Sequence, residues 1–367
     1  MTFINDRIHG SIEISDLAQS IIDTPEFQRL RRICQSGVLL WIFPSSNHSR
    51  FEHSLGVYHL AKSFATNLSY NLKIKNKNRL IEIIAIAGLV HDLGHLAFSH
   101  LFEAFLKGKG ITFHHEELSQ KLFRKVCKDY NINLSDSEIE MVINIIHPLD
   151  NWSDGFIWEG ENIGKWPYQI VASPITGIDV DKFDYLLRDS VACGLKVSFD
   201  YDRILKMSKV INGEIVFPWK LRFNIFEMYL SRYQLHLRVY HHKTAIALEI
   251  LVSQILEELG KEYDFMKKIK NYDILDLTDN IIFNYKNENI RKLLNRIETR
   301  NYPKITSKED AKYLIPITNA LCSEDENPLT KIKYLNKTNN IIYADIEDYG
   351  ILASQSYTHK INYYFSQ

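Results

Sequence analysis

Apolar residues recur every three or four positions through most of the first 260 residues, which is the spacing of one face of a helix. Few Gly or Pro residues interrupt the clearest stretches, which lie at 27–33, 55–68, 80–90 and 118–126. Residues 220–259 show the same pattern over a longer run, and Asp23-Thr24 before Pro25 is a helix-start signal. The pattern therefore predicts a mainly α fold.

Strand signals are fewer. In KVINGEIVF (209–217), β-branched residues flank Asn212-Gly213, a pair favoured in the two-residue turns of hairpins, so we predict a short β-hairpin there. From about residue 271 the chain is rich in Asn and Lys, with one strand candidate at 339–346, and we expect residues 148–167 to form a loop. These signals predict a helical core domain at 1–270 and a smaller mixed α/β C-terminal lobe at 271–367.

Charge and cysteine content exclude several classes of protein. The formal net charge is −1, so there is no overall attraction to nucleic acid or to an anionic membrane. The four cysteines lie far apart without a CxxC pair, which disfavours a zinc ribbon and a disulfide framework. The most apolar run, IEIIAIAGLV, is too short to span a bilayer, and the N-terminal segment lacks the pattern of a signal peptide. We expect a cytoplasmic protein without a membrane or nucleic-acid partner.

Polar residues with metal-binding chemistry interrupt one apolar helical run. Residues 88–100, GLVHDLGHLAFSH, contain three histidines and an aspartate, which cost free energy in a core unless a surface, a hydrogen-bond network or a metal satisfies them. His53 lies upstream in SRFEHSLGV, and four aspartates lie downstream in GIDVDKFDYLLRD. Imidazole and carboxylate together suit a divalent metal such as Mn, Mg, Fe, Zn or Ni.

The order H…HD…D resembles the HD phosphohydrolase superfamily. Longer motifs resemble its deoxynucleoside-triphosphate (dNTP) triphosphohydrolases, in particular the antiviral branch that joins a sterile-alpha-motif domain to an HD domain. These motifs are INDRIHGSIEI, IIDTPEFQRLRRI, FPSSNHSRFEHSLGVYHLA, VHDLGHLAFSH, GIDVDKFDYLLRD and RVYHHK. The resemblance runs from about residue 3 to residue 350. It implies an HD-type phosphohydrolase domain over 1–270, with the 271–367 lobe contributing to an oligomeric or regulatory site.

The resemblance also implies a reaction: metal-dependent hydrolysis of a dNTP to a deoxynucleoside and inorganic triphosphate. The implied metal ligands are His53, His91, Asp92 and Asp181, with Asp179 in a supporting role. The implied catalytic residues are His95, His100, Glu103 and His115, with His100 as general acid. His95 lies four residues after His91, so we expect both on one helical face if the helix continues.

The resemblance extends to the substrate. Arg50 and Lys182 are implied phosphate contacts, since Arg offers a bidentate fork and Lys a point charge. The other implied substrate contacts are Gln35, Tyr185, Asp189, Arg232, Tyr240 and His242. Ser36 follows Gln35 where relatives have Leu, so the discrimination against ribonucleotides is open.

Regulation by nucleotides is implied in the same way. The antiviral relative is activated by GTP and a dNTP bound between subunits, so we expect a homo-oligomer, dimer or tetramer, gated by such activators. The implied contacts are Asn5, Asp23, Gln28, Arg31, Arg203, Arg238, Lys243, Arg300 and Lys304. The alternative is that these charged residues belong to solvated helix faces.

Two other functions stay open. One is an HD phosphohydrolase that acts on nucleoside monophosphates or nucleic-acid ends, and the other is a non-catalytic nucleotide sensor. Lys182 with Arg50 favours a triphosphate, and the presence of every implied metal and acid residue disfavours a sensor. The sequence leaves open the native metal and the preferred base. It also leaves open the biological role, which could be defence against virus or phage or the balance of nucleotide pools.

Overall fold

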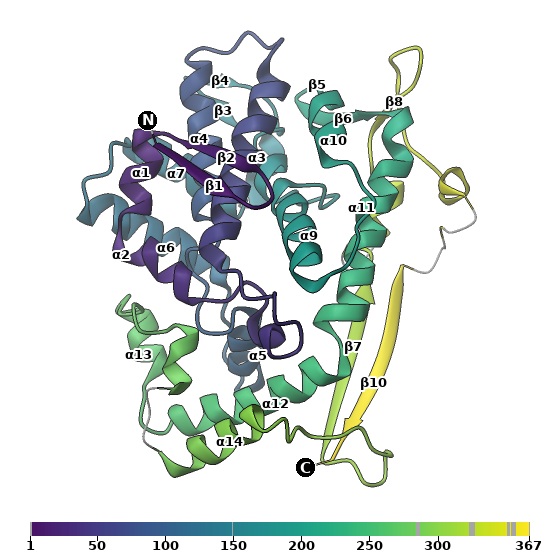
Figure 1. Ribbon diagram of the computed structural model, residues 1–367. Helices are drawn as coiled ribbons and strands as arrows, with labels where there is room; N and C mark the ends of the chain where they lie inside the picture. The colour runs from purple at the N-terminus through teal and green to yellow at the C-terminus, as the bar shows by residue number, and fades with distance from the viewer. Residues whose placement is uncertain are drawn as a thin grey trace.

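The computed structural model describes residues 2–148, 150–283, 287–322, 327–350, 353 and 357–366. Helices dominate this part of the chain, which confirms the predicted mainly α fold (Figure 1). The helices of the first half are α1 (Asp16–Ile22), α2 (Pro25–Gln28), α3 (Arg50–Ser69), α4 (Lys77–Val90), α5 (His100–Gly108), α6 (His115–Asp129) and α7 (Asp136–Ile146). The later helices are α8 (Tyr168–Val171), α9 (Val180–Cys193), α10 (Tyr201–Met207), α11 (Arg222–Leu235), α12 (Lys243–Leu259), α13 (Phe265–Lys270) and α14 (Glu288–Glu298).

Helix α3 organises the core. It packs against α4 on one side and α9 on another, while α7 packs against α4 and α6 (Figure 1). Gly88 permits a close approach of α4 to α3, because a Cβ at this position would lie 3.0 Å from the Val57 carbonyl oxygen. The apolar residues that predicted these helices are buried, including Leu55, Phe64, Ile83 and Val90. The start of α3, the end of α4 and the start of α9 consequently meet in one region.

The N-terminal segment differs from its prediction. Strands β1 (Thr2–Asp6) and β2 (Gly10–Ile14) form an antiparallel hairpin that the helical pattern did not indicate. Thr24 caps α2 with its side chain, as the helix-start signal predicts. The helix is short, however, and continues as the 3-10 turn η1 (Arg29–Arg32).

The predicted hairpin at 209–217 is confirmed. Strands β5 (Lys209–Ile211) and β6 (Glu214–Pro218) pair through Asn212 and Gly213, whose positive φ angles of 52° and 78° suit a tight hairpin turn. The 339–346 prediction is too long, since only β9 (Ile341–Ile342) is a strand, paired with β8 (Tyr334–Leu335). The stretch 148–167, predicted as a loop, contains the short strands β3 (Ile157–Trp158) and β4 (Glu161–Asn162).

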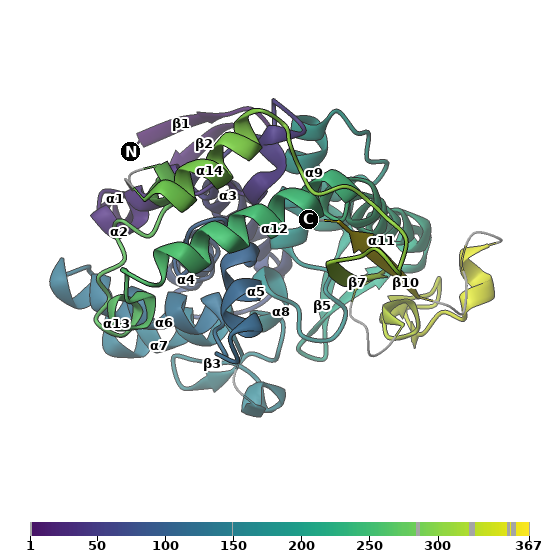
Figure 2. The ribbon, with the colours of Figure 1, turned by 90° about the horizontal axis from the view of Figure 1, so that it is seen from below.

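The long helical run at 220–259 is interrupted. Between α11 and α12 the chain forms a π-helical turn, η5 (His236–Tyr240), and a bend at 241–242. Helix α12 then crosses the base of the molecule with α14 against it (Figures 1 and 2). Beside α12, the long strands β7 (Tyr313–Ala320) and β10 (Thr358–Phe365) form an antiparallel pair that sequence patterns did not reveal.

The C-terminal segment is joined to the helical core by several contacts. Strand β8 pairs in parallel with β6, and the second, smaller apolar cluster combines Ile246 and Ile250 of α12 with Phe365 of β10. The proposed division into 1–270 and 271–367 stays a prediction. No helix within the described part of the chain has the length and apolar character needed to cross a membrane.

Candidate functional site

The four predicted metal ligands come together from three segments. His53 lies in the first turn of α3, His91 and Asp92 directly follow α4, and Asp181 lies in the first turn of α9. His53 Nε2 lies 3.1 Å from Asp181 Oδ1 and 3.5 Å from Asp92 Oδ2. His91 Nε2 lies 3.3 Å from Asp92 Oδ1 and 3.6 Å from Asp181 Oδ1. Two imidazole nitrogens and two carboxylates therefore face one small volume.

The orientation of both histidines suits metal binding. The Nδ1 atom of His53 is 2.7 Å from Asp184 Oδ2, and that of His91 is 2.8 Å from the Gly88 carbonyl oxygen. With Nδ1–H donating in each ring, Nε2 carries the lone pair. Both Nε2 atoms are buried without a hydrogen-bond partner. A divalent cation would supply the missing partner, so the residues present fit a metal.

A layer of charged residues behind His53 was not predicted. Asp184 accepts two hydrogen bonds from Arg188, each 2.9 Å long, and its Oδ1 is 2.7 Å from His9 Nε2. Arg188 also donates to Asp6, 2.8 Å away, at the tip of the β1–β2 hairpin. Burial alone would raise the pKa of Asp184, but Arg188, His53 and His9 hold it well below its usual range. The available signal was spacing, because Asp184 lies one helical turn after Asp181.

The predicted catalytic residues form a second cluster beside the metal ligands. The ring of His95 stacks on that of His115, with centroids 3.7 Å apart, and His95 Nε2 is 3.4 Å from Asp92 Oδ1. Glu103 accepts from the backbone N–H of His115 at 3.0 Å and lies 2.6 Å from His115 Nδ1. Its other oxygen is 3.3 Å from Nδ1 of His100, whose side chain is 69% exposed. Glu103 thus orients both a buried and an exposed imidazole.

His95 was expected to share a helical face with His91 if the helix continued, but the helix does not continue to His95. Helix α4 ends at Val90, and the chain turns through His91–Gly94 instead of continuing as a helix. The backbone N–H of His95 donates to the Asp92 carbonyl, 3.1 Å away, which is the bond of a turn. Gly94 lies against the next segment, since a Cβ there would be 2.2 Å from the His115 carbonyl oxygen. This close approach brings His95 onto His115.

Charge is distributed unevenly over this cluster. Burial, Arg50 and His115 hold the pKa of His95 well below its usual range, so its ring is neutral at pH 7. Burial would raise the pKa of Glu103, but His100 and His115 outweigh it and keep that carboxyl ionised. The pKa of His115 is raised despite burial, chiefly by its bond to Glu103. The cluster therefore combines the neutral imidazole of His95 with the ionised carboxylate of Glu103, which contacts the other two imidazoles, those of His100 and His115.

Four of the predicted substrate residues lie around the metal ligands and the end of α9. Arg50 donates to Asp92 at 2.5 Å, to Ser99 Oγ at 3.0 Å and to the Gln35 carbonyl at 3.3 Å. These bonds use three of its five N–H groups and leave two for a ligand. Tyr240 OH donates to Asp189 at 2.6 Å, and the Oε1 atom of Gln35 is buried without a hydrogen-bond partner.

His48 is a further unpredicted member, because its Nε2 is 2.6 Å from Asp189 Oδ1. Ser36, which follows Gln35, is 2.7 Å from the hydroxyl of Ser46. The wall behind Gln35 is therefore polar.

Three further substrate candidates lie on α9 and α11: Lys182 and Tyr185 near the start of α9, and Arg232 near the end of α11. Lys182 donates to Asp179 at 3.0 Å, and Asp179 also caps α9 by accepting from the Lys182 backbone. Asp179 therefore stabilises the helix that carries Asp181, and it makes no bond to the ligands themselves among the described contacts. Arg232 donates to the Ala320 carbonyl at 2.7 Å and has a buried Nε without a partner. Burial raises the pKa of Tyr185 to about 12, although the positive charges of Arg232 and Lys182 lower it.

The predicted activator residues fall into separate places. Lys243, Arg300 and Lys304 line one pocket of about 310 Å³ together with Thr244, Tyr302 and Phe365. His242, predicted to lie by the base, caps α12 next to this pocket, where its Nδ1 accepts from the Thr244 backbone.

The other activator residues lie outside this pocket. Gln28 accepts from Arg31 at 2.8 Å and donates to the Ile22 carbonyl beside Asp23, so these three form one surface group. Asn5 lies on β1, Arg203 on α10 and Arg238 in η5, and both arginines are exposed.

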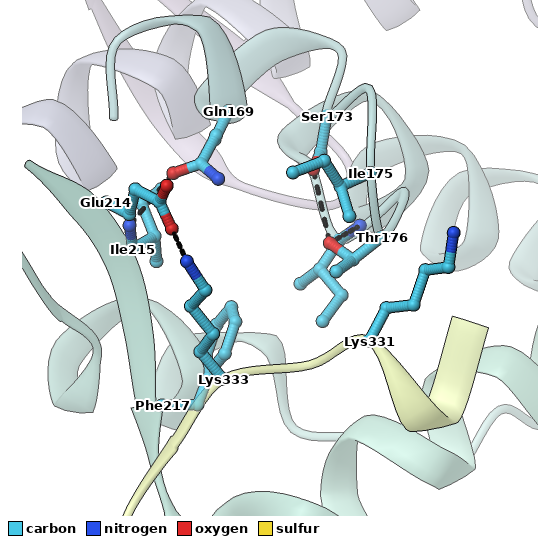
Figure 3. Close-up of a pocket in the computed structure, with 10 residues that line it drawn as sticks. Gln169, Ser173, Ile175, Thr176, Glu214, Ile215, Phe217, Lys331 and Lys333 are labelled. Carbon is cyan, nitrogen blue, oxygen red and sulfur yellow. Dashed lines mark hydrogen bonds and ion pairs between the residues drawn. The ribbon is translucent and has the colours of Figure 1, made fainter. Parts of the chain in front are cut away.

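A smaller hollow lies between α8, β6 and the segment around Lys331 (Figure 3). Its volume is about 30 Å³, about a tenth of that of the pocket lined by Lys243, Arg300 and Lys304. The Lys333 ammonium group reaches the Glu214 carboxylate across it, and Ser173 faces Thr176 at 3.2 Å (Figure 3). None of the predicted site residues lines this hollow, so the candidate site is the region around the metal ligands.

Comparison with known proteins found a family match and several similar proteins. Residues 50–189 match the model of the HD domain family, and the predicted metal ligands and the second cluster both lie within this match. The chain is also similar to proteins named deoxynucleoside triphosphate triphosphohydrolase SAMHD1. The Dictyostelium discoideum homolog is 34% identical over 83% of this chain and 60% of its own length. The Homo sapiens protein is 33% identical over 82% of this chain and 54% of its own. The chain thus spans a little over half the length of these relatives.

Proposed function

We propose that this protein hydrolyses dNTPs to a deoxynucleoside and inorganic triphosphate in a metal-dependent reaction. One observation carries the proposal: two buried Nε2 atoms without partners face two carboxylates, beside a glutamate that contacts two imidazoles, with a third imidazole stacked on one of them. The name shared by the relatives supports the substrate class. The choice among Mn, Mg, Fe, Zn and Ni and the cytoplasmic location stay predictions from the sequence.

The residues divide the chemistry between them. His53, His91, Asp92 and Asp181 would hold the cation, which when bound polarises the α-phosphate and lowers the pKa of water. In the reaction, a water oxygen would bond to the α-phosphorus as the water gives up one proton to solvent, and the bond from phosphorus to the 5′-oxygen would break. His100 donates a proton to that leaving oxygen, and Glu103 keeps its ring in place. His95, neutral and buried, faces the phosphate without adding charge.

The substrate would be held by groups around this centre. Arg50 has two free N–H groups for a phosphate oxygen, and Lys182 and Arg232 supply further positive charge. Gln35 Oε1 lacks a hydrogen-bond donor that a sugar hydroxyl would provide. Asp189, fixed by His48 and Tyr240, would accept from the same sugar. Tyr185 and His242 stay candidates for the sugar and the base.

The test is to identify the products. Purified protein with Mn²⁺ is incubated with each dNTP, with and without GTP, and the products are separated by anion exchange. Deoxynucleoside plus triphosphate is the expected result, and His91→Ala/Asp92→Ala should give neither. Release of phosphate or pyrophosphate would instead indicate another HD phosphohydrolase. Nucleotide binding without any product would indicate a sensor.

We propose further that nucleotides regulate an oligomer of this chain. The 310 Å³ pocket supports this idea, because Lys243, Arg300 and Lys304 place three cationic side chains around one cavity suited to a phosphorylated ligand. GTP or a dNTP should increase the sedimenting mass and the rate, and Lys304→Glu should abolish both responses. Unchanged mass and rate with every nucleotide would contradict this proposal.

A further inference from the structure

Asp279 connects the C-terminal segment to two loops of the site. It begins the 3-10 turn η6 (Asp279–Phe283), far along the chain from the HD domain match. Its Oδ1 accepts from the Phe98 backbone N–H at 2.6 Å, and its Oδ2 accepts from the Cys34 backbone N–H at 2.7 Å. Cys34 precedes Gln35, and Phe98 precedes Ser99. One carboxylate therefore holds two loops that each supply a group to the site.

The loop at Phe98 is strained and needs such support. Phe98 and Ser99 have φ angles of 60° and 56°, where residues other than glycine cost roughly 1–3 kcal/mol each. Ser99 Oγ donates to the Cys34 carbonyl at 3.0 Å and accepts from Arg50 Nε at 3.0 Å. Arg50 in turn donates to Asp92, a predicted metal ligand. The bonds run without a gap from Asp279 to the metal site.

Two arginines bind the segment that precedes Asp279. The buried Arg29 donates to the carbonyls of Leu93 and His95, at 2.6 and 2.7 Å, and approaches the Leu277 carbonyl at 3.5 Å. Arg32 donates to the Leu275 carbonyl at 3.0 Å. Arg29 thus links the segment at Leu277 to the turn that carries His91, Asp92 and His95. Asp279 lies two residues after Leu277 and bonds to the Cys34 and Phe98 backbones.

We propose that Asp279 is a positioning residue of the active site, which fixes the Cys34 and Phe98 backbones so that Ser99 holds Arg50 against Asp92. This inference rests on the proposed triphosphohydrolase function. The two backbone N–H groups are bonded to different oxygens of the carboxylate, and in an asparagine one of these two positions would be an NH2 group, which donates and cannot accept. Burial raises the pKa of this carboxyl to about 7, although its two backbone hydrogen bonds and Arg50 lower it. Groups with such perturbed pKa values are common at functional sites.

The test compares Asp279→Asn with Asp273→Asn. Asp273 lies in the same segment but pairs with Lys268 at the surface, so its variant carries the same chemical change away from the site. With Mn²⁺ and a dNTP, we expect Asp279→Asn to lower kcat about 10-fold, as loss of a supporting bond does elsewhere. Asp273→Asn should match the wild type. Melting temperatures and metal content of the same samples separate lost positioning from unfolding.

A double-mutant cycle with Ser99→Ala tests the route. If Asp279 acts through Ser99, the two losses in kcat are not additive, and the double variant is close to the worse single variant. Additive losses, or an Asp279→Asn rate within about 2-fold of Asp273→Asn, would overturn the inference while leaving the proposed function intact. A wild-type protein that releases no triphosphate would overturn the proposed function itself.

Discussion

At the scale of single residues, the predicted metal site depends on which nitrogen of His53 carries the proton. Asp184 accepts from Nδ1 and so directs the lone pair of Nε2 toward Asp92 and Asp181. Asp184 can reach His53 because position 56, one turn along α3, is a glycine. A Cβ there would lie 1.8 Å from Asp184 Oδ1 and 2.6 Å from Arg188 Nη2.

Gly56→Ala should therefore impair metal binding without weakening α3. Alanine favours a helix, but its methyl group would displace Asp184 and leave His53 without its acceptor. We expect metal content or activity to fall about 10- to 100-fold, measured by elemental analysis and the triphosphate assay. Gly108→Ala is the matched control, because a Cβ there meets nothing within 4 Å. Equal metal content in the two variants would contradict this account.

At the scale of elements, the site is assembled at helix ends. His53 lies at the start of α3, His91 and Asp92 after the end of α4, and Asp181 at the start of α9. Helix starts leave backbone N–H groups unpaired, so a cap is needed there. In α9 the cap is Asp179, whose Oδ1 accepts from the Lys182 backbone and whose Oδ2 accepts from the Ser173 backbone.

Asp179→Ala should destabilise the protein through α9. Losing a cap costs about 1 kcal/mol, and the unpaired Ser173 N–H adds to this, so we expect the free energy of unfolding to fall by about 2 kcal/mol. Asp179→Asn keeps the capping oxygen and should cost about half as much. Urea denaturation measures both. If the two variants lost equal stability, the capping role of Asp179 would be wrong.

At the scale of the whole molecule, a bound metal would join distant segments. Its four predicted ligands come from α3, the turn after α4 and α9, and these segments meet only in the folded chain. A ligand that binds the folded state alone stabilises it by mass action, by about 2.7 kcal/mol at a hundredfold excess over Kd.

Chelation should accordingly lower the melting temperature by a few degrees, and Mn²⁺ should restore it. The double variant His91→Ala/Asp92→Ala should melt at the same temperature with and without Mn²⁺. Calorimetry of both proteins measures the shift. A wild-type melting temperature that ignores both chelator and Mn²⁺ would argue against this cluster as the metal site.

The sequence by itself determined the local features. The apolar spacing predicted α3, α4 and α6, because a 3.6-residue period is written into consecutive residues. Asn212-Gly213 predicted the β5–β6 turn, since few other pairs adopt two positive φ angles. The order of the histidine and aspartate motifs indicated which residues belong to the site, although their roles stay predictions.

Tertiary structure decided which partners those residues have. The His53–Asp184 bond, the Arg29 contacts with the turn after α4 and the Asp279 bonds to Cys34 and Phe98 all join residues distant in sequence. No local pattern encodes such pairs, because they depend on how closely helices approach. Local patterns also did not reveal the bend before α12 or the pairing of β7 with β10, since these two strands lie far apart in the sequence. The chain therefore specifies its site residues locally, and only packing of the whole fold sets their geometry.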